Sequence, residues 1–204
     1  MPMIVAVEGP SAAGKTTWCR ATRRQFVAEY TPTGKEPDGS DPAEQATYWA
    51  QVNTQRWTQA LALEDATGVA VCDSDPLKLH YSWCLAAVGA APITRFEREL
   101  AAVRKMFTGR HLGFADVVLL SVPDPQQLVL QRAGDPSRRR RHFDLHARLA
   151  EPLTEWYRAL DRLAPGRVVD GFPPKLDDVR LPPLRPDRHN RDLLDALVDE
   201  LPEV

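Results

Sequence analysis

The chain has 204 residues, 43% of them hydrophobic and 26% charged, which predicts one soluble globular domain over residues 1–204 with a full hydrophobic core. A formal net charge of −2 argues against a nucleic-acid polymer or a membrane surface as the partner. Three cysteines without C-x-x-C spacing are typical of reduced thiols in a cytoplasmic protein, and we expect neither a signal peptide nor a membrane span.

The first predicted element is a short apolar strand over residues 3–7, which is typical of a buried parallel strand. The turn after it, GPSAAGKT, fits the phosphate-loop pattern G-x-x-x-x-G-K-[ST] in every fixed position. Glycines let the backbone turn with its N–H groups pointing inward, and the following helix brings its positive dipole end to the same place. The predicted phosphate-binding residues are Gly9, Ser11, Ala12, Ala13, Gly14, Lys15, Thr16 and Thr17.

Two side chains of this loop have specific expected roles. Lys15 should reach the β- and γ-phosphates of a nucleotide, and the hydroxyl of Thr16 should bind Mg²⁺.

Strands and helices alternate along the rest of the chain. Further strands are predicted near residues 29–31, 69–72, 116–122 and 167–169, and helices over 15–28, 43–66, 76–88, 94–107, 125–132, 143–163 and 191–201. This order predicts a three-layer α/β fold, in which helices cover both faces of a five-stranded parallel sheet. The proline-rich stretch 171–190 is expected to lie extended over the surface.

Asp73 ends an interior strand, at the sheet edge where open α/β sheets bind ligands. A carboxylate there would hold Mg²⁺ opposite Thr16, or face the acceptor of a transferred group. The alternative role for Asp73 is an N-cap of the helix that follows, although Ser74 or Asp75 could serve as that cap instead.

Several segments, taken in order, resemble the thymidylate kinase and deoxynucleoside kinase superfamily of phosphate-loop kinases. KEPDG at 35–39 resembles the R-E-P-G-G segment, and VCDSD at 71–75 stands where the family has a strand followed by Asp-Arg. QVNTQRW at 51–57 resembles the helix that faces the acceptor, and QRAGDPSRRRRHF at 131–143 resembles the arginine-rich lid, expected at about 133–142. One departure is Ser74, which stands in place of the arginine and so removes an expected cation.

The resemblance implies roles for further residues. Glu36 would be the general base on the acceptor hydroxyl, and Arg56 would face the acceptor. Trp49 and Gln51 would bind the acceptor by stacking and hydrogen bonding, although core packing is the alternative for an aromatic side chain on this helix. The lid arginines would stabilise the moving charge, with Arg132, Arg138 and Arg140 as the catalytic candidates; a solvated basic loop is the alternative.

Together these features predict an ATP- and Mg²⁺-dependent kinase that transfers the γ-phosphoryl group to a small acceptor. By resemblance the acceptor is a nucleoside or a nucleoside monophosphate, and the family's frequent dimers leave a homodimer as an option. Two alternatives stay open: a kinase for another alcohol, such as a natural product or antibiotic, and a regulatory nucleotide-binding NTPase without an acceptor.

Overall fold

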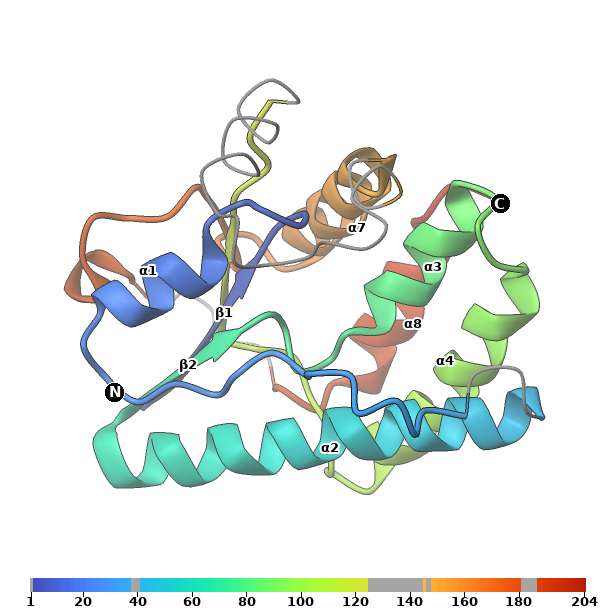
Figure 1. The fold of residues 1–204 in the computed structure, drawn as a ribbon, viewed down its shortest axis with the longest axis horizontal. Coiled ribbons are helices and arrows are strands. Elements are labelled where there is room, and N and C mark those ends of the chain that lie inside the picture. The colour runs from blue at the N-terminus through green and yellow to red at the C-terminus, as the bar shows by residue number, and fades with distance from the viewer. Residues whose placement is uncertain (1, 38–40, 125–144, 146–147, 181–186) are drawn as a thin grey trace.

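The computed structural model describes residues 2–37, 41–124, 145, 148–180 and 187–204 (Figure 1). Its strands are β1 (Met3–Glu8), β2 (Val69–Asp73), β3 (Val117–Leu120) and β4 (Val168–Asp170). Its helices are α1 (Lys15–Ala21), α2 (Pro42–Thr67), α3 (Leu79–Ala87), α4 (Ile93–Thr108), α7 (Ala150–Leu163) and α8 (Arg191–Asp199), with a 3-10 turn η1 at Leu176–Asp178.

The four strands form one parallel sheet in the order β2-β1-β3-β4. Val5 of β1 is paired with Val71 on one side and Val117 on the other, so β1 lies inside the sheet and its carboxyl end opens into the phosphate loop. The parallel α/β arrangement expected from the sequence is confirmed.

The fifth strand was predicted at the wrong place. Residues 29–31 form no strand, and the chain instead makes an isolated parallel bridge between Val27 and Cys72, at the outer edge of β2. The expected first helix was also too long, because α1 ends at Ala21 and Arg23 adopts a left-handed backbone with φ of 55°. This early end lets the chain return to the sheet edge at Val27.

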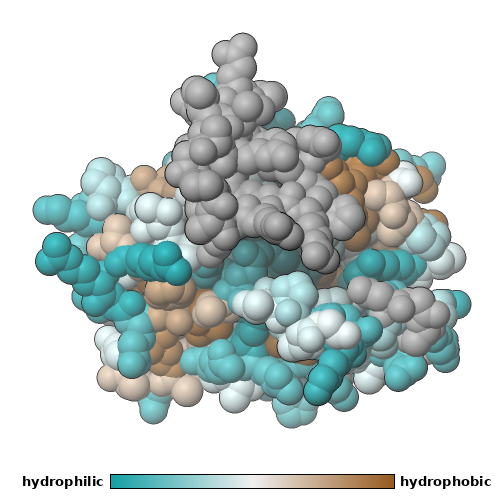
Figure 2. Space-filling view, viewed as in Figure 1, coloured by the Kyte–Doolittle hydropathy of each residue, from teal (hydrophilic) through white to brown (hydrophobic). Residues whose placement is uncertain are grey.

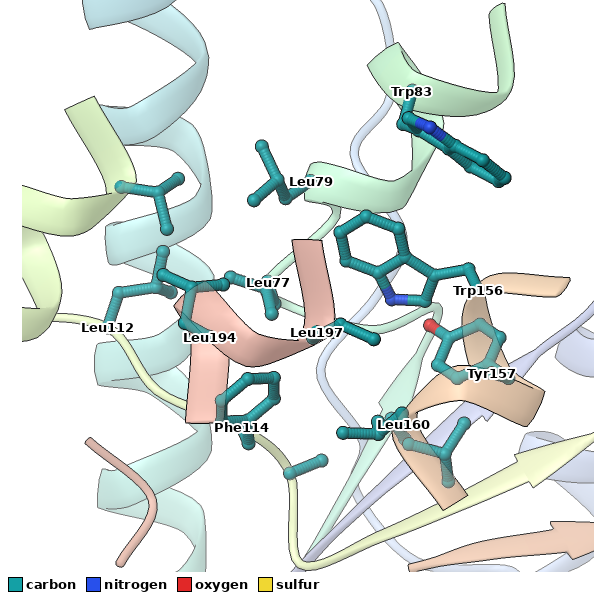
Figure 3. Packing of buried hydrophobic residues seen from close by; sticks show 14 of the residues in the cluster. Leu77, Leu79, Trp83, Leu112, Phe114, Trp156, Tyr157, Leu160, Leu194 and Leu197 are labelled. Atoms are coloured by element: carbon teal, nitrogen blue, oxygen red, sulfur yellow. The ribbon is translucent and has the colours of Figure 1, made fainter. Parts of the chain in front are cut away.

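Apolar side chains alternate between the two faces of the sheet. On one face, Ile4 and Ala6 join the larger core together with side chains of α2, α3, α4, α7 and α8 (Figures 1 and 3). On the other face, Val5 and Val7 pack with Cys19 of α1. Helices therefore cover both faces, unequally.

The proline-rich C-terminal stretch is more deeply packed than the sequence suggested. Leu176 and Val179 are buried against the smaller core, and Leu194 and Leu197 of α8 are fully buried in the larger one (Figure 3). Within 171–190 the expectation of an extended surface segment is wrong for Leu176 and Val179, because these two apolar side chains anchor the chain on the smaller core. Leu194 and Leu197 belong to α8, where a helix was expected.

Few large hydrophobic side chains of the described residues are exposed: Val122, Val169 and Val204. On the face shown in Figure 2, hydrophilic side chains separate the hydrophobic areas. Within the described part of the chain, no helix has the length and apolar character needed to cross a membrane. The three cysteines are buried and form no disulfide.

Candidate active site

The phosphate loop between β1 and α1 has the backbone that its glycines permit. A Cβ atom on Gly9 would lie 2.2 Å from the carbonyl oxygen of Ser121, so the close approach to β3 requires glycine at this position. Gly14 has φ of 87° and Ala12 has φ of 77°, both in the left-handed region, which turns the loop before α1 begins. The loop predicted from the sequence pattern is therefore formed.

Lys15 lies over this loop. Its Nζ atom donates to the carbonyl oxygens of Gly9, at 2.8 Å, and Pro10, at 3.3 Å. The ammonium group is thus held at the end of β1, where it lines the cavity described below.

Thr16 and Asp73 meet at the carboxyl ends of β1 and β2, as their positions predicted. The Thr16 hydroxyl donates to Asp73 Oδ2 at 2.6 Å, while Asp73 Oδ1 is buried without a hydrogen-bond partner among the described residues. Burial raises the pKa of Asp73, and a bound cation would oppose that shift. A carboxylate oxygen without a partner beside a hydroxyl oxygen fits a hard divalent cation such as Mg²⁺.

A cavity of about 1200 Å³ runs from the phosphate loop to the space between α2, α3 and α4. Beyond the loop, its wall is mixed in character, with aromatic, acidic and basic side chains. Among them are Glu29, Tyr30, Trp49, Asn53, Arg56, Lys78, His80, Tyr81, Arg95 and Glu99. One continuous space therefore connects the phosphate loop with a chamber large enough for a second small molecule.

Aromatic side chains in the wall of this chamber pack against one another. Tyr30 packs edge-on against Trp49, with ring centroids 5.3 Å apart and an interplanar angle of 84°. Trp49 lines the cavity, as a side chain expected to bind an acceptor should, whereas Gln51, two residues further along α2, is exposed and does not line it.

Glu36 lies outside the cavity wall. Its carboxylate accepts hydrogen bonds from the Tyr30 hydroxyl and from the backbone N–H groups of Thr33 and Gly34. These bonds, that from Tyr30 first, lower the pKa of Glu36 to about 2. In this arrangement the Glu36 side chain stabilises the loop to which it belongs. Glu29, seven residues earlier, has a carboxylate that lines the cavity.

Arg56 is buried and its guanidinium is engaged by the main chain. It donates to the carbonyl oxygens of Ala28, at 3.1 Å, Asp73, at 2.8 Å, and Ser74, at 2.7 Å, with a further bond to that of Asp75. Arg56 therefore fixes the turn after β2, which bears Asp73, and only part of its surface faces the cavity. The family resemblance implied that Arg56 faces the acceptor. Spacing along α2 does not reveal which carbonyl groups lie opposite this side chain.

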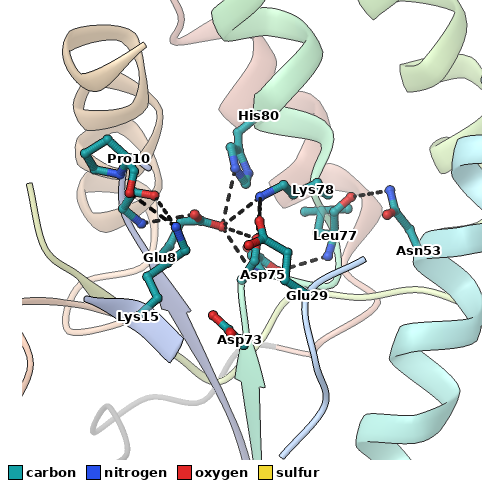
Figure 4. A network of polar contacts seen from close by, with 12 residues as sticks. Glu8, Pro10, Lys15, Glu29, Asn53, Asp73, Asp75, Leu77, Lys78 and His80 are labelled. Atoms are coloured by element: carbon teal, nitrogen blue, oxygen red, sulfur yellow. Dashed lines mark hydrogen bonds and ion pairs between the residues drawn. The ribbon is translucent and has the colours of Figure 1, made fainter. Parts of the chain in front are cut away.

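A buried polar cluster behind the phosphate loop was not predicted (Figure 4). Glu8, the last residue of β1, accepts from the Ser74 hydroxyl at 2.8 Å and from the Asp75 N–H at 3.0 Å. Its Oε2 atom also lies 3.6 Å from Lys78 Nζ and 3.5 Å from His80 Nε2. The sequence feature that could have indicated this cluster is the glutamate directly before the first glycine of the phosphate loop.

The charges of this cluster favour an ionised Glu8. Burial by itself would raise the pKa of Glu8, but the Lys78 ammonium and the neighbouring groups outweigh it and hold the pKa well below the ordinary range. For His80, burial dominates and lowers the pKa to about 3, so the ring is neutral in the folded protein.

The lid arginines Arg132, Arg138 and Arg140 lie outside the described residues, so their roles stay predictions. Within the described ranges, no group of three or more histidine, cysteine or acidic side chains is arranged to hold a metal ion. Oxygen atoms of a bound nucleotide and of water would complete the coordination shell begun by Thr16 and Asp73.

Comparison with known proteins supports the fold. No family model matches the sequence, and the search of curated proteins finds no match. Among solved structures, deoxyadenosine kinase from M. mycoides is similar. Its form with the products dCMP and a flexible dCDP has a TM-score of 0.55 and 12% identity, covering 82% of this chain and 89% of that one.

Two further structures of the same enzyme agree. The form with bound dATP has a TM-score of 0.55 and 16% identity over 82% of this chain and 91% of that one. The form with bound dCTP has a TM-score of 0.50 and 12% identity over 97% and 100%. At these identities the likeness concerns the fold, and at that level it confirms the resemblance seen in the sequence: this chain has the fold of a deoxynucleoside kinase.

Proposed function

We propose that this protein transfers the γ-phosphoryl group of ATP to a hydroxyl group of a small acceptor, and that the acceptor is a nucleoside. The observation that carries the proposal is the single cavity that joins the phosphate loop to a chamber lined by Tyr30, Trp49 and Asn53. A regulatory NTPase needs the first part of this cavity but has no use for the second.

The donor end of the cavity uses the loop predicted from the sequence. The N–H groups of residues 11–17 would surround the phosphates, and Lys15 would leave the carbonyl oxygens of Gly9 and Pro10 to contact the β- and γ-phosphates. Thr16 and Asp73 would hold Mg²⁺, which when bound neutralises negative charge on the phosphates.

The charges of the chamber favour an uncharged acceptor over a monophosphate. Arg95 is paired with Glu99 at 2.9 Å, and the guanidinium of Arg56 is committed to main-chain carbonyl groups. Glu29 also lines the wall, and its carboxylate is paired with Lys78 at 3.4 Å. Because these three cations already have carboxylate or main-chain partners, a nucleoside, which brings no negative charge, fits this wall better than a monophosphate.

The proposal is tested by measuring ADP release from Mg²⁺-ATP with a panel of acceptors. Because the similar solved structures are of a deoxyadenosine kinase, deoxyadenosine heads the panel, followed by other nucleosides, nucleoside monophosphates and unrelated alcohols. We expect a strong rise with one nucleoside and a loss of about 100-fold or more in kcat for Lys15→Ala, which removes one cation from the transferred group.

Control variants separate the two ends of the site. Lys175→Ala changes an exposed lysine away from the cavity and should behave as the wild type. Glu36→Gln tests whether the loop glutamate takes the proton, as the resemblance implies, or only closes its loop. A slow release of ADP that no acceptor increases would contradict the nucleoside kinase and favour the regulatory NTPase; a rise only with unrelated alcohols would favour the other kinase.

A further inference from the structure

We propose that Lys78 is a second catalytic lysine, whose ammonium contacts the phosphoryl group in transfer from the acceptor side. The inference rests on the proposed kinase function and assigns a residue that the sequence pattern did not indicate. It starts from Ser74, which stands where the resembling kinases have arginine. In the structure the Lys78 ammonium donates a hydrogen bond to the Ser74 hydroxyl. The side chain of Lys78 therefore brings a cation to the position where the resembling kinases have the arginine.

The surroundings of Lys78 place its charge at the cavity. The Nζ atom lies 3.6 Å from Glu8 Oε2 and 3.4 Å from Glu29 Oε1, and the side chain is 26% exposed and lines the cavity (Figure 4). Glu8 is fixed in the interior, whereas the side chain of Glu29 is 43% exposed. An incoming phosphoryl group can therefore replace Glu29 as the partner of Lys78 while Glu8 keeps the ammonium in place.

The backbone holds Lys78 in an unusual conformation. Its φ of 48° is in the left-handed region, and among the described residues no side-chain hydrogen bond caps the helix that begins after it. Asn53 and Arg56 of α2 bind the carbonyl oxygens of the same turn. Strain held in place by neighbouring elements is typical of functional sites.

Stability alone does not account for this lysine. An ion pair as buried as that of Lys78 with Glu8 is often no more stabilising than apolar side chains of similar size. A role in catalysis would account for this ion pair, because the Lys78 ammonium is held in place to stabilise the negative charge of the phosphoryl group in transfer.

The step balances as follows. The acceptor hydroxyl oxygen bonds to the γ-phosphorus, and the bond from that phosphorus to the bridging oxygen of ATP breaks, leaving its electron pair on ADP. The hydroxyl proton passes to a carboxylate of the cavity and then to water. Lys78 forms and breaks no covalent bond; it stabilises the negative charge on the transferred oxygens.

The first test compares Lys78→Met and Lys78→Arg with the wild type. With the best acceptor of the panel, kcat of Lys78→Met should fall by about 100-fold, the typical loss of one such charge contact, and Lys78→Arg should retain more activity. Binding gives a second readout by calorimetry: Lys78→Met should bind ADP as the wild type does, but should bind ADP with aluminium fluoride much more weakly. Lys105→Met, on the exposed side of α4, is the matched control.

The second test separates catalysis from folding. Lys78→Met alone leaves the Glu8 carboxylate buried without its lysine, so the double variant Glu8→Gln/Lys78→Met removes both charges together. We expect the double variant to fold and to stay as inactive as Lys78→Met, whereas Glu8→Gln alone, which keeps the ammonium, should be more active than either. Recovery of activity in the double variant would overturn the proposal.

The two proposals can fail separately. If the wild type transfers phosphate to no acceptor, the proposed function is wrong. Weaker binding of ADP with aluminium fluoride by Lys78→Met would even then support a contact between Lys78 and the phosphoryl group. If the wild type is an active kinase and Lys78→Met matches it in kcat and in both binding measurements, the role of Lys78 is wrong and the function stands.

Discussion

At the scale of single residues, the neutral state of His80 has a consequence for stability. Burial lowers the pKa of His80 to about 3, and the nearby Glu8 carboxylate does not reverse this. Between pH 6.5 and 3 the unfolded chain therefore binds a proton that the folded protein does not, so stability falls as the pH falls. From pH 8 to pH 5 the wild type should lose about 2 kcal/mol more than His80→Gln, measured by urea unfolding.

The comparison with His80→Gln removes the effect of other groups. Protonation of Glu8 and the other carboxylates at low pH lowers the free energy of unfolding of both proteins. Their contributions therefore cancel in the difference between the two proteins. Parallel pH profiles for the two proteins would mean that His80 takes up its proton in the folded protein as readily as in the unfolded chain. A wild type that gains stability relative to His80→Gln as the pH falls would mean that the ring is charged and paired with Glu8.

At the scale of elements, Arg188 joins three parts of the chain. Its guanidinium donates to Glu64 of α2 at 2.7 Å and to Asp116, just before β3, at 2.9 Å, while its carbonyl oxygen accepts from the Phe114 N–H. Asp116 is fully buried and Glu64 nearly so. Arg188→Gln should therefore reduce the free energy of unfolding by about 3–5 kcal/mol, the cost of removing one partner of a buried ion pair.

The matched control is Arg162→Gln. Arg162 pairs with Glu200 at 3.0 Å, but the two side chains are 55% and 45% exposed, so the change should cost no more than about 1 kcal/mol. Equal losses in the two variants, measured by urea unfolding at neutral pH, would show that the junction at Arg188 does not hold the C-terminal segment to the sheet.

At the scale of the whole molecule, α8 makes the C-terminus part of the central core. Leu197 is fully buried among residues from several helices of the chain. The single domain predicted from the sequence implies that Leu197→Ala lowers the stability of the entire protein, by about 2–5 kcal/mol, and that calorimetry shows one unfolding transition at a lower temperature.

A second, separate transition in the calorimetric trace, with only that transition moved by Leu197→Ala, would contradict a single cooperative unit. Val204→Ala is the control, because Val204 is 50% exposed and its change should leave the transition where it is.

Local patterns were enough to predict the conformation of the phosphate loop. The phosphate-loop spacing determines its own backbone, since glycine at positions 9 and 14 permits what other residues there would not, and Lys15 and Thr16 follow within the same turn. The apolar strands and the long helix α2 were likewise predicted within a few residues, because their hydrophobic spacing and the Asp41 cap are local. The meeting of Thr16 with Asp73 followed from the common edge of parallel strands.

The acceptor side depended on contacts between distant parts of the chain. Whether Glu29 or Glu36 faces the cavity is decided by where the segment after α1 leaves the sheet, and Arg56 turned inward because carbonyl groups of the β2 turn lie opposite it. Lys78 reaches Glu8 only because two strands and a strained turn bring residues 70 positions apart within 3.6 Å. A sequence specifies the periodicity and the turns of a chain directly, whereas charge partners across the fold are fixed only when the elements pack.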